Sequence, residues 1–304
     1  MPALLTLKYA LFALFAASVV YVHCRGRVRH RLFRQLGDHS TFMAPYNTLV
    51  YLFSTLPDRP YTRVDAFPDL LKLRADWEMI REEGLQLLNQ EMIRAAQGYN
   101  DIGFNSFFRT GWKRFYLKWY DDFLPSAREL CPKTVELLGR LPTVNAAMFA
   151  VLPPGARLVR HRDPFAGSLR YHLGLSTPNS PDCYIVVDGD TYYYRDGHDM
   201  VFDETYIHYA ENKTDTTRLI LFCDVERPFT NPVMRALNRF MARHVMRAAE
   251  TKNVDGEKIG VLNRLFARVY PIRIWGKKLK AWNRSAYYAS KWFAFGLLAY
   301  LIFW

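Results

Sequence analysis

The pattern of apolar and polar positions indicates a helix near the N-terminus that is long enough to cross a membrane. An apolar run from Leu4 to Val22 is interrupted only by Lys8 and is followed by an arginine-rich segment that ends at Arg34. A helix of about 19 residues rises roughly 28 Å, close to the thickness of a bilayer core. Because the basic residues follow the apolar run, an uncleaved anchor is favoured over a cleaved signal peptide.

From about residue 143 the pattern changes to short apolar or alternating runs, which predict β-strands. Turn signals such as Pro153–Gly155 and Asp188–Gly189 separate the runs. The predicted strands are 146–152, 157–161, 169–176, 183–187, 191–194, 200–203, 207–210 and 219–225. Eight short strands with small turns favour an antiparallel double sheet of the jelly-roll type, which leaves a cavity between its two sheets.

Helical periodicity lies on both sides of these strands. The apolar stretch 46–56 is too short to span a membrane and predicts a buried or interfacial helix. Residues 69–97 predict one or two helices behind a sheet, with Gly84 as a weak point or break. In 233–248 an apolar face adjoins a basic stripe of Arg235, Arg239, Arg243 and Arg247. Packing on the domain and contact with anionic lipid are both compatible with this last helix.

The last segment, 292–304, is apolar and aromatic but short for a membrane span, and Lys291 precedes it. A tilted second span and a surface helix both remain open. The chain is therefore divided into a membrane anchor with a basic linker (1–34), a jelly-roll domain with N-terminal helices (35–230), and basic, apolar, membrane-associated helices (231–304). The expected fold class is α+β, a double-stranded β-helix with flanking helices.

The net charge of +12 is concentrated at the two ends of the chain. Residues 1–34 carry +6 and residues 231–304 carry +11, whereas residues 35–230 carry −5. A nucleic-acid-binding protein usually has its basic surface on the folded domain. Basic residues beside the most apolar segments instead favour an anionic membrane surface, and they place the middle of the chain in the cytoplasm.

The candidate chemistry lies in the strand-rich region. His161 and Asp163 stand two positions apart near the end of a predicted strand, and His208 lies 45 residues beyond Asp163. Two imidazoles and one carboxylate with open coordination positions are the ligand set of a non-haem iron(II) oxygenase, with zinc as the rival metal. Arg218 offers a bidentate fork for a carboxylate, which favours iron with an acidic cosubstrate. Arg170 and His172 share one face of the predicted strand 169–176.

These motifs together resemble the aspartyl/asparaginyl β-hydroxylase family, and within it the bacterial members that hydroxylate lipid A. The resemblance extends from Tyr21 to Pro228. It is carried by Cys131-Pro-Lys-Thr134, Pro153-Pro-Gly155, His161-Arg-Asp163, Gly167–Leu175, Phe202-Asp-Glu204, His208, Arg218, the upstream Asn105–Tyr120 and His39–Phe42. One departure is at Ala150, where the family has a serine that helps to hold the cosubstrate.

The resemblance implies His161, Asp163 and His208 as the iron ligands. It places Arg218 on the distal carboxylate of 2-oxoglutarate, with Arg170 and His172 near its keto-acid end. The animal protein hydroxylases of the family lack the acidic iron ligand, which this chain retains as Asp163.

The implied cofactors are Fe(II), the cosubstrate 2-oxoglutarate and O2, with ascorbate as an aid in vitro. The implied reaction is hydroxylation of lipid A at C2 of a secondary acyl chain, with release of succinate and CO2. The alternatives are an aspartyl/asparaginyl hydroxylase that acts on a protein or another lipid, and a non-catalytic jelly-roll binding module. We expect the bacterial inner membrane as the location, contact with anionic lipid, no nucleic acid and no particular protein partner.

Overall fold

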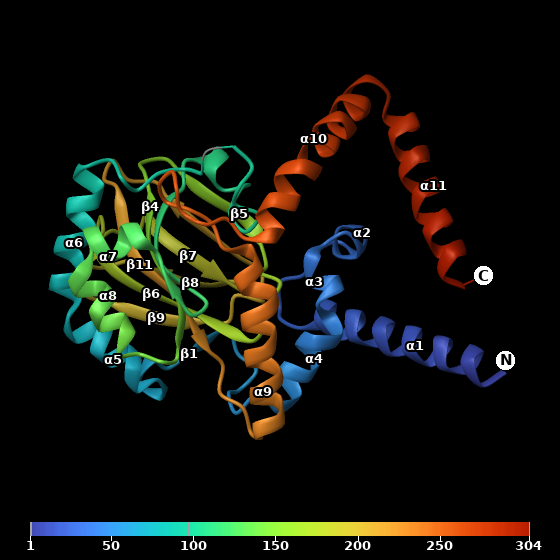
Figure 1. Cartoon of the computed structure of the whole chain (residues 1–304), viewed down its shortest axis with the longest axis horizontal. Coiled ribbons are helices and arrows are strands. Elements are labelled where there is room, and N and C mark those ends of the chain that lie inside the picture. Colours follow the sequence, from blue (N-terminus) through green and yellow to red (C-terminus); the bar gives the residue numbers. More distant parts are fainter. Residues whose placement is uncertain (1, 97, 304) are drawn as a thin grey trace.

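The computed structural model describes residues 2–96 and 98–303, and two antiparallel β-sheets form its centre. The major sheet has seven strands in the order β1-β9-β6-β11-β4-β2-β3, and the minor sheet has four in the order β5-β10-β7-β8. Residues from both sheets line one common pocket. The sheets therefore face each other as a double-stranded β-helix, which confirms the predicted fold class (Figure 1).

All eight strands predicted from the sequence are present, with ends that differ by at most two residues. The major sheet consists of β1 (Tyr61–Thr62), β2 (Lys113–Trp119), β3 (Asp122–Phe123), β4 (Val144–Leu152), β6 (Ser168–Ser176), β9 (Asp199–Phe202) and β11 (Arg218–Glu226). The minor sheet consists of β5 (Arg157–His161), β7 (Cys183–Val187), β8 (Asp190–Tyr193) and β10 (His208–Asn212). The expectation that strands begin near residue 143 was wrong, because β1, β2 and β3 precede that position. The longest of them, β2, pairs with β4.

Four helices lie along one side of the sheet pair (Figure 1). They are α5 (Pro68–Ala75), α6 (Trp77–Asn89), α7 (Pro125–Leu130) and α8 (Pro132–Gly139). Helix α6 packs on β6, and Gly84 makes the close approach feasible, because a Cβ there would lie 3.0 Å from the Phe149 ring. The helix continues through Gly84 without interruption. The expected break at this glycine is absent, since its role is to give the sheet room.

The remaining helices lie at the two ends of the chain. The N-terminal ones are α1 (Pro2–Cys24), α2 (Leu32–Leu36), α3 (His39–Phe42) and α4 (Ala44–Phe53). The C-terminal ones are α9 (Pro232–Met241), a π-helical turn at Ala242–Met246, α10 (Val261–Trp282) and α11 (Arg284–Phe303). Short 3₁₀ turns occur at Val64–Ala66, Phe108–Thr110 and Arg247–Ala249.

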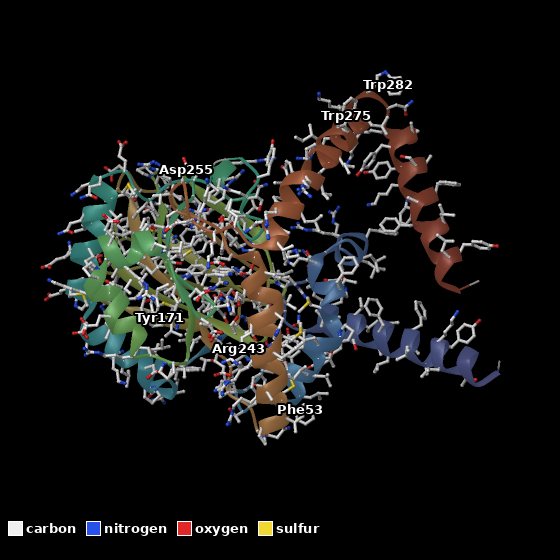
Figure 2. The ribbon with its side chains drawn as sticks, viewed as in Figure 1. Phe53, Tyr171, Arg243, Asp255, Trp275 and Trp282 are labelled. Carbon is white, nitrogen blue, oxygen red and sulfur yellow. The ribbon has the colours of Figure 1, made fainter. Side chains whose placement is uncertain are left out.

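Helices α1 and α11 both project from the same side of the sheet body (Figure 1). Within α1, Thr6–Cys24 is long and apolar enough to cross a membrane, and only 11% of it is buried. Helix α10 and helix α11 form a hairpin, and Trp275 and Trp282 project from α10 away from the body (Figure 2). Residue 304, the end of the segment considered for a second span, lies outside the described residues.

The C-terminal end of α1 is fastened to the sheets through a buried cluster of charges. Arg25 donates to Asp203 at 2.7 Å and to the hydroxyl of Thr205 at 2.7 Å. Arg227 donates to the same oxygen of Asp203, also at 2.7 Å. Burial alone would raise the pKa of Asp203, but Arg227 and Arg25 hold it well below its ordinary value. The carboxylate is therefore charged at neutral pH and joins α1 to the segment after β9.

We expect Asp203→Asn to lower the free energy of unfolding by about 3–5 kcal/mol, because two buried arginines lose their shared anion. Since the native pKa of Asp203 is depressed, this contribution is present at neutral pH and disappears as the pH falls below the ordinary range of an aspartate. Denaturant titration of the detergent-solubilised protein at neutral and acidic pH measures both effects. Asp190→Asn, which removes a half-exposed partner of the exposed Arg27, is the matched control and should change stability little.

Candidate metal centre and cosubstrate pocket

The structure brings His161, Asp163 and His208 together at one end of the pocket. His161 ends β5, His208 begins β10, and the two are cross-strand partners. One ligand atom from each of the three residues lies within 4.8 Å of the others. Asp163 is not on a strand: it follows β5 in a loop, and its N–H donates to the carbonyl oxygen of Glu204 at 2.9 Å. Three such donors on one side of a point suit a divalent metal ion with open positions.

Both histidines present a neutral Nε2 to this point. The Nδ1 of His161 lies 2.6 Å from the carbonyl oxygen of Val159, and the Nδ1 of His208 lies 2.9 Å from that of Tyr206. A carbonyl only accepts, so each Nδ1 carries the proton and each Nε2 keeps its lone pair. Burial, reinforced by the neighbouring His161, lowers the pKa of His208 to about 3. Burial also lowers the pKa of His161.

Arg170 lies behind Asp163 and holds it in the charged form. Its guanidinium donates to Asp163 at 2.9 Å and to Asp224 at 2.8 Å, and it also contacts Glu204. Burial opposes ionisation of Asp163, but Arg170 and then the two histidines keep its pKa below the ordinary value. Two nitrogens of Arg170, Nε and Nη2, are thus engaged by protein carboxylates, and the residue also lines the pocket.

Arg218 lies at the other end of the pocket and is almost fully buried. Its guanidinium carbon is 4.4 Å from the centre of the Tyr194 ring. Among the described residues, its Nε and Nη1 have no hydrogen-bond partner. Buried donors without partners are costly, so this end of the pocket is built for a molecule that supplies acceptor oxygens.

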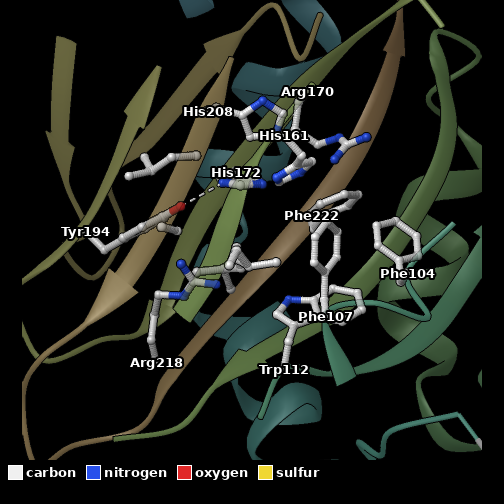
Figure 3. Close-up of a pocket in the computed structure, with 14 residues that line it drawn as sticks. Phe104, Phe107, Trp112, His161, Arg170, His172, Tyr194, His208, Arg218 and Phe222 are labelled. Atoms are coloured by element: carbon white, nitrogen blue, oxygen red, sulfur yellow. Dashed lines mark hydrogen bonds between the residues drawn. The ribbon is translucent and has the colours of Figure 1, made fainter. Parts of the chain in front are cut away.

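His172 lies between the two ends, as Figure 3 shows. Its Nδ1 is 3.0 Å from the hydroxyl of Tyr194, while its Nε2 has no partner within the described part of the chain. Burial, followed by the nearby Arg218, lowers the pKa of His172 well below its ordinary value. The imidazole is therefore neutral. In the tautomer in which Nδ1 accepts from the Tyr194 hydroxyl, Nε2 carries the proton and is a donor toward the pocket.

Aromatic side chains form one wall of the pocket (Figure 3). Trp112 stacks on Phe104 at 4.8 Å between ring centres, and Phe107 lies 4.5 Å from the ring of His161. Phe222 completes this wall from β11. The wall is apolar up to the edge of the three candidate metal ligands.

Asp224, Glu204 and Tyr194 were not identified from the sequence as site residues. Asp224 follows Arg218, Ile220 and Phe222 on the alternate positions of β11 that face inward, so a polar residue on an apolar inner face was an available signal. Ala150 faces Ile220 across β4 and β11. It is buried beside the Arg218 end of the pocket, where a serine would have added a hydroxyl.

The family comparison covers the strands that carry this site. The model of the aspartyl/asparaginyl β-hydroxylase family matches residues 74–228, just over half of the chain. This chain belongs to the aspartyl/asparaginyl β-hydroxylase family. Because the match runs from α5 to the end of β11, it contains every residue of the pocket, whereas α1–α4 and α9–α11 lie outside it.

Several relatives of this β-hydroxylase family member are known. The ornithine lipid ester-linked acyl 2-hydroxylase of Rhizobium tropici is 31% identical over 182 residues, which cover 59% of this chain and 65% of that protein. The human aspartyl/asparaginyl β-hydroxylase is 26% identical over 205 residues, 64% of this chain and 26% of that protein. The matches thus span less than two thirds of these relatives. A solved prolyl-4-hydroxylase of Pseudomonas putida is 18% identical, with a TM-score of 0.36 over 51% of this chain and 88% of its own.

We expect the purified protein to bind one divalent metal ion per chain through the three converging residues. Titration with Co(II), followed by its visible absorption, reports binding and coordination without any turnover. His208→Ala removes one of three ligands and should abolish the absorption band. His198→Ala alters an exposed histidine in a turn and should leave the band unchanged. An unaltered band in His208→Ala would show that the metal lies elsewhere.

Proposed function

We propose that this protein is an Fe(II)- and 2-oxoglutarate-dependent dioxygenase that hydroxylates C2 of an acyl chain in a membrane lipid. The observation that carries the proposal is that one pocket has a candidate metal site at one end and a buried arginine at the other. His161, Asp163 and His208 converge at one end, and the buried, unpartnered guanidinium of Arg218 lies at the other. Family membership and the acyl 2-hydroxylase of R. tropici support the same reaction class.

The residues present fit an iron ion and a dicarboxylate. His161, Asp163 and His208 would hold the metal, and the neutral histidines and charged aspartate have the protonation states that coordination needs. Arg218 would bind the distal carboxylate of 2-oxoglutarate, whose oxygens satisfy Nε and Nη1. His172 would donate its Nε2–H near the keto-acid end. We assign Arg170 to the orientation of Asp163, since its Nε and Nη2 contact carboxylates; as a lining residue of the pocket, it would also lie near the keto-acid end.

When bound, iron and 2-oxoglutarate supply the oxidising power that inserts one atom of O2 into a C–H bond and yields succinate and CO2. The protein supplies position and exclusion of water. The wall formed by Phe104, Phe107 and Trp112 presents an apolar surface beside the metal-binding residues. An acyl chain packed on this wall would place its C2 atom, and the ester carbonyl bonded to it, near the metal.

A lipid substrate agrees with the rest of the chain. Helix α1 has the length and composition of a membrane span, and a lipid with several acyl chains rarely leaves a bilayer. We propose lipid A, hydroxylated on a secondary acyl chain, at the bacterial inner membrane with the catalytic domain in the cytoplasm. Ornithine lipid, named for the R. tropici relative, presents the same ester-linked acyl group and is the second lipid to test.

The aspartyl and asparaginyl side chains of a protein are the alternative substrate, supported by the animal relatives. The apolar wall of the pocket favours an acyl chain over a polar side chain. A non-catalytic binding module would keep the pocket and release no succinate.

The purified protein with Fe(II), ascorbate, 2-oxoglutarate and O2 should release succinate when lipid is added. Lipid A and ornithine lipid, offered separately, should each be analysed by mass spectrometry for a gain of one oxygen atom at C2 of an acyl chain. His208→Ala should release none, and His198→Ala should behave as the parent protein. Oxygen gain only on an aspartyl or asparaginyl peptide would replace the lipid substrate. No succinate with any substrate would favour the binding module.

Arg218→Ala should raise the KM for 2-oxoglutarate roughly tenfold to a hundredfold, because a buried carboxylate loses a charged, bidentate partner worth about 1.5–3 kcal/mol. Arg218→Lys should recover part of the loss, since it restores the charge without the fork. Arg157→Ala, which alters an exposed arginine on β5, is the matched control. An unchanged KM in Arg218→Ala would contradict the assignment of this residue.

A further inference from the structure

Large apolar side chains are exposed on the helices that follow α1 and on α9, which packs on α4. On α2, α3, α4 and α9, six of them are between 55% and 78% exposed: Leu32, Phe33, Phe42, Leu52, Val233 and Phe240. Neighbouring helices in this group pack on one another, α2 with α3, α3 with α4 and α4 with α9. We call this surface the α2–α4–α9 face. Large apolar side chains gathered on adjoining helices mark an interaction site, because exposed leucine and phenylalanine side chains gain free energy by leaving water.

Helix α9 combines paired basic residues with exposed apolar ones. Three of the four arginines of the basic stripe pair with acids of the protein. Arg239 of α9 pairs with Glu226 at 3.0 Å, and in the turns that follow α9, Arg243 pairs with Asp121 at 3.2 Å and Arg247 contacts Asp122. Val233 and Phe240 of α9 are exposed.

Two observations identify what covers this face. It is continuous with α1, which packs on α4 and has the length of a bilayer span. Its apolar pair Leu32 and Phe33 is also flanked by exposed cations, Arg29, Arg31 and Arg34. The single acid between Arg25 and Phe53 is Asp38, which is partly buried and accepts from the N–H of Ser40. Apolar side chains beside cations match an anionic bilayer surface, where the rings enter the headgroup region and the arginines meet phosphate.

The same helices are bonded to the loop that carries the metal-binding residues. Arg34 donates to the carbonyl oxygen of Arg160 at 2.8 Å, and Nε2 of His39 lies 2.6 Å from that of Arg162. Asn47 donates to the carbonyl oxygen of Pro164 at 2.9 Å. The backbone around His161 and Asp163 is therefore held by residues of α2, α3 and α4. These are the same helices that expose apolar side chains on the α2–α4–α9 face.

We propose that the α2–α4–α9 face lies on the surface of an anionic phospholipid bilayer and positions the metal-binding loop one helix layer from the lipid. A helix with its side chains is about 10 Å thick, so an acyl chain leaves the bilayer by only a short distance before it reaches the pocket. The contact with lipid stands on the exposed face alone. The delivery of an acyl chain rests on the proposed lipid hydroxylase function.

The contact with lipid is tested with the full-length protein in vesicles of phosphatidylglycerol and phosphatidylethanolamine. The photoreactive residue p-benzoylphenylalanine replaces Phe33 or Phe42, and in the control it replaces the exposed Gln86 of α6, a helix on the opposite side of the body from α1 (Figure 1). Irradiation should attach phospholipid at positions 33 and 42 and not at 86. Cross-linked dimers at 33 and 42 would replace the bilayer by a second copy of the chain. No adduct there, or equal lipid labelling at all three positions, would overturn the proposal.

The delivery of substrate is tested with Leu32→Glu/Phe33→Glu and with Phe42→Glu, which place anions on the face without touching the pocket. Hydroxylation of lipid in anionic vesicles should fall about tenfold or more, the effect of losing a few buried apolar side chains. Affinity for 2-oxoglutarate and turnover of the same lipid dispersed in detergent should remain within about twofold. Gln86→Glu is the matched control. An equal loss in detergent and in vesicles would assign these residues a structural role only.

The two experiments distinguish failure of the bilayer contact from failure of the proposed hydroxylase function. Lipid adducts form whether or not the enzyme turns over, so a protein without hydroxylase activity still answers the question of the bilayer contact. Succinate release in detergent with no lipid adduct at positions 33 and 42 would leave the hydroxylase proposal standing and remove this one.

Discussion

The interior of the barrel depends on the ion pairs that the guanidinium group of Arg170 makes with three carboxylates. Three carboxylates, those of Asp163, Glu204 and Asp224, meet around it in a space that is largely closed to water. Buried like charges without a counterion are strongly destabilising. With Arg170 among them, the acids can be held close together, and the fold can place an ionised carboxylate beside two neutral histidines.

The acids around Arg170 do not share its charge equally. The pKa of Asp163 is lowered, whereas the pKa of Asp224 is raised. At Asp224, burial and the negative charge of Asp163 outweigh the opposing effect of Arg170. The charged form is thus favoured at the residue that faces the metal-binding point, and the residue behind it retains a proton more readily. Because Asp163 belongs to a loop, its position depends on Arg170 and on its own N–H bond to Glu204.

Much of the barrel could be predicted from the sequence, because its signals are local. The eight strands from β4 to β11 alternate or form short apolar runs between turn residues, and the paired histidines stand at strand ends. Strand β2 lacks such a signal, since four consecutive residues from Arg114 to Leu117 are buried and hide the alternation. Gly84 is predicted from the sequence to be a weak point of the helix, but the helix runs through it. The reason for a glycine there is the close packing of α6 against Phe149, which the sequence does not show.

The partners of charged residues were harder to predict, since they come from distant parts of the chain. Nothing near Arg170 in sequence indicates Asp224, and nothing near Arg243 indicates Asp121. Helical periodicity is the same whether the arginines of 235–247 face lipid or protein. Which of them contact the protein is known only from the ion pairs in the structure.

The joint at the end of α1 has a consequence for how this protein meets its substrate. Arg25 is held by Asp203 and Thr205, and Arg162, between the candidate metal ligands His161 and Asp163, donates to the carbonyl oxygen of Val22 at 2.9 Å. With α1 in a bilayer, such a joint prevents the domain from tumbling about its anchor. For the proposed lipid substrate, the search would then take place by lateral diffusion in two dimensions. Turnover would follow the surface density of the lipid in one leaflet, and dilution of the cells or vesicles in their medium would leave it unchanged.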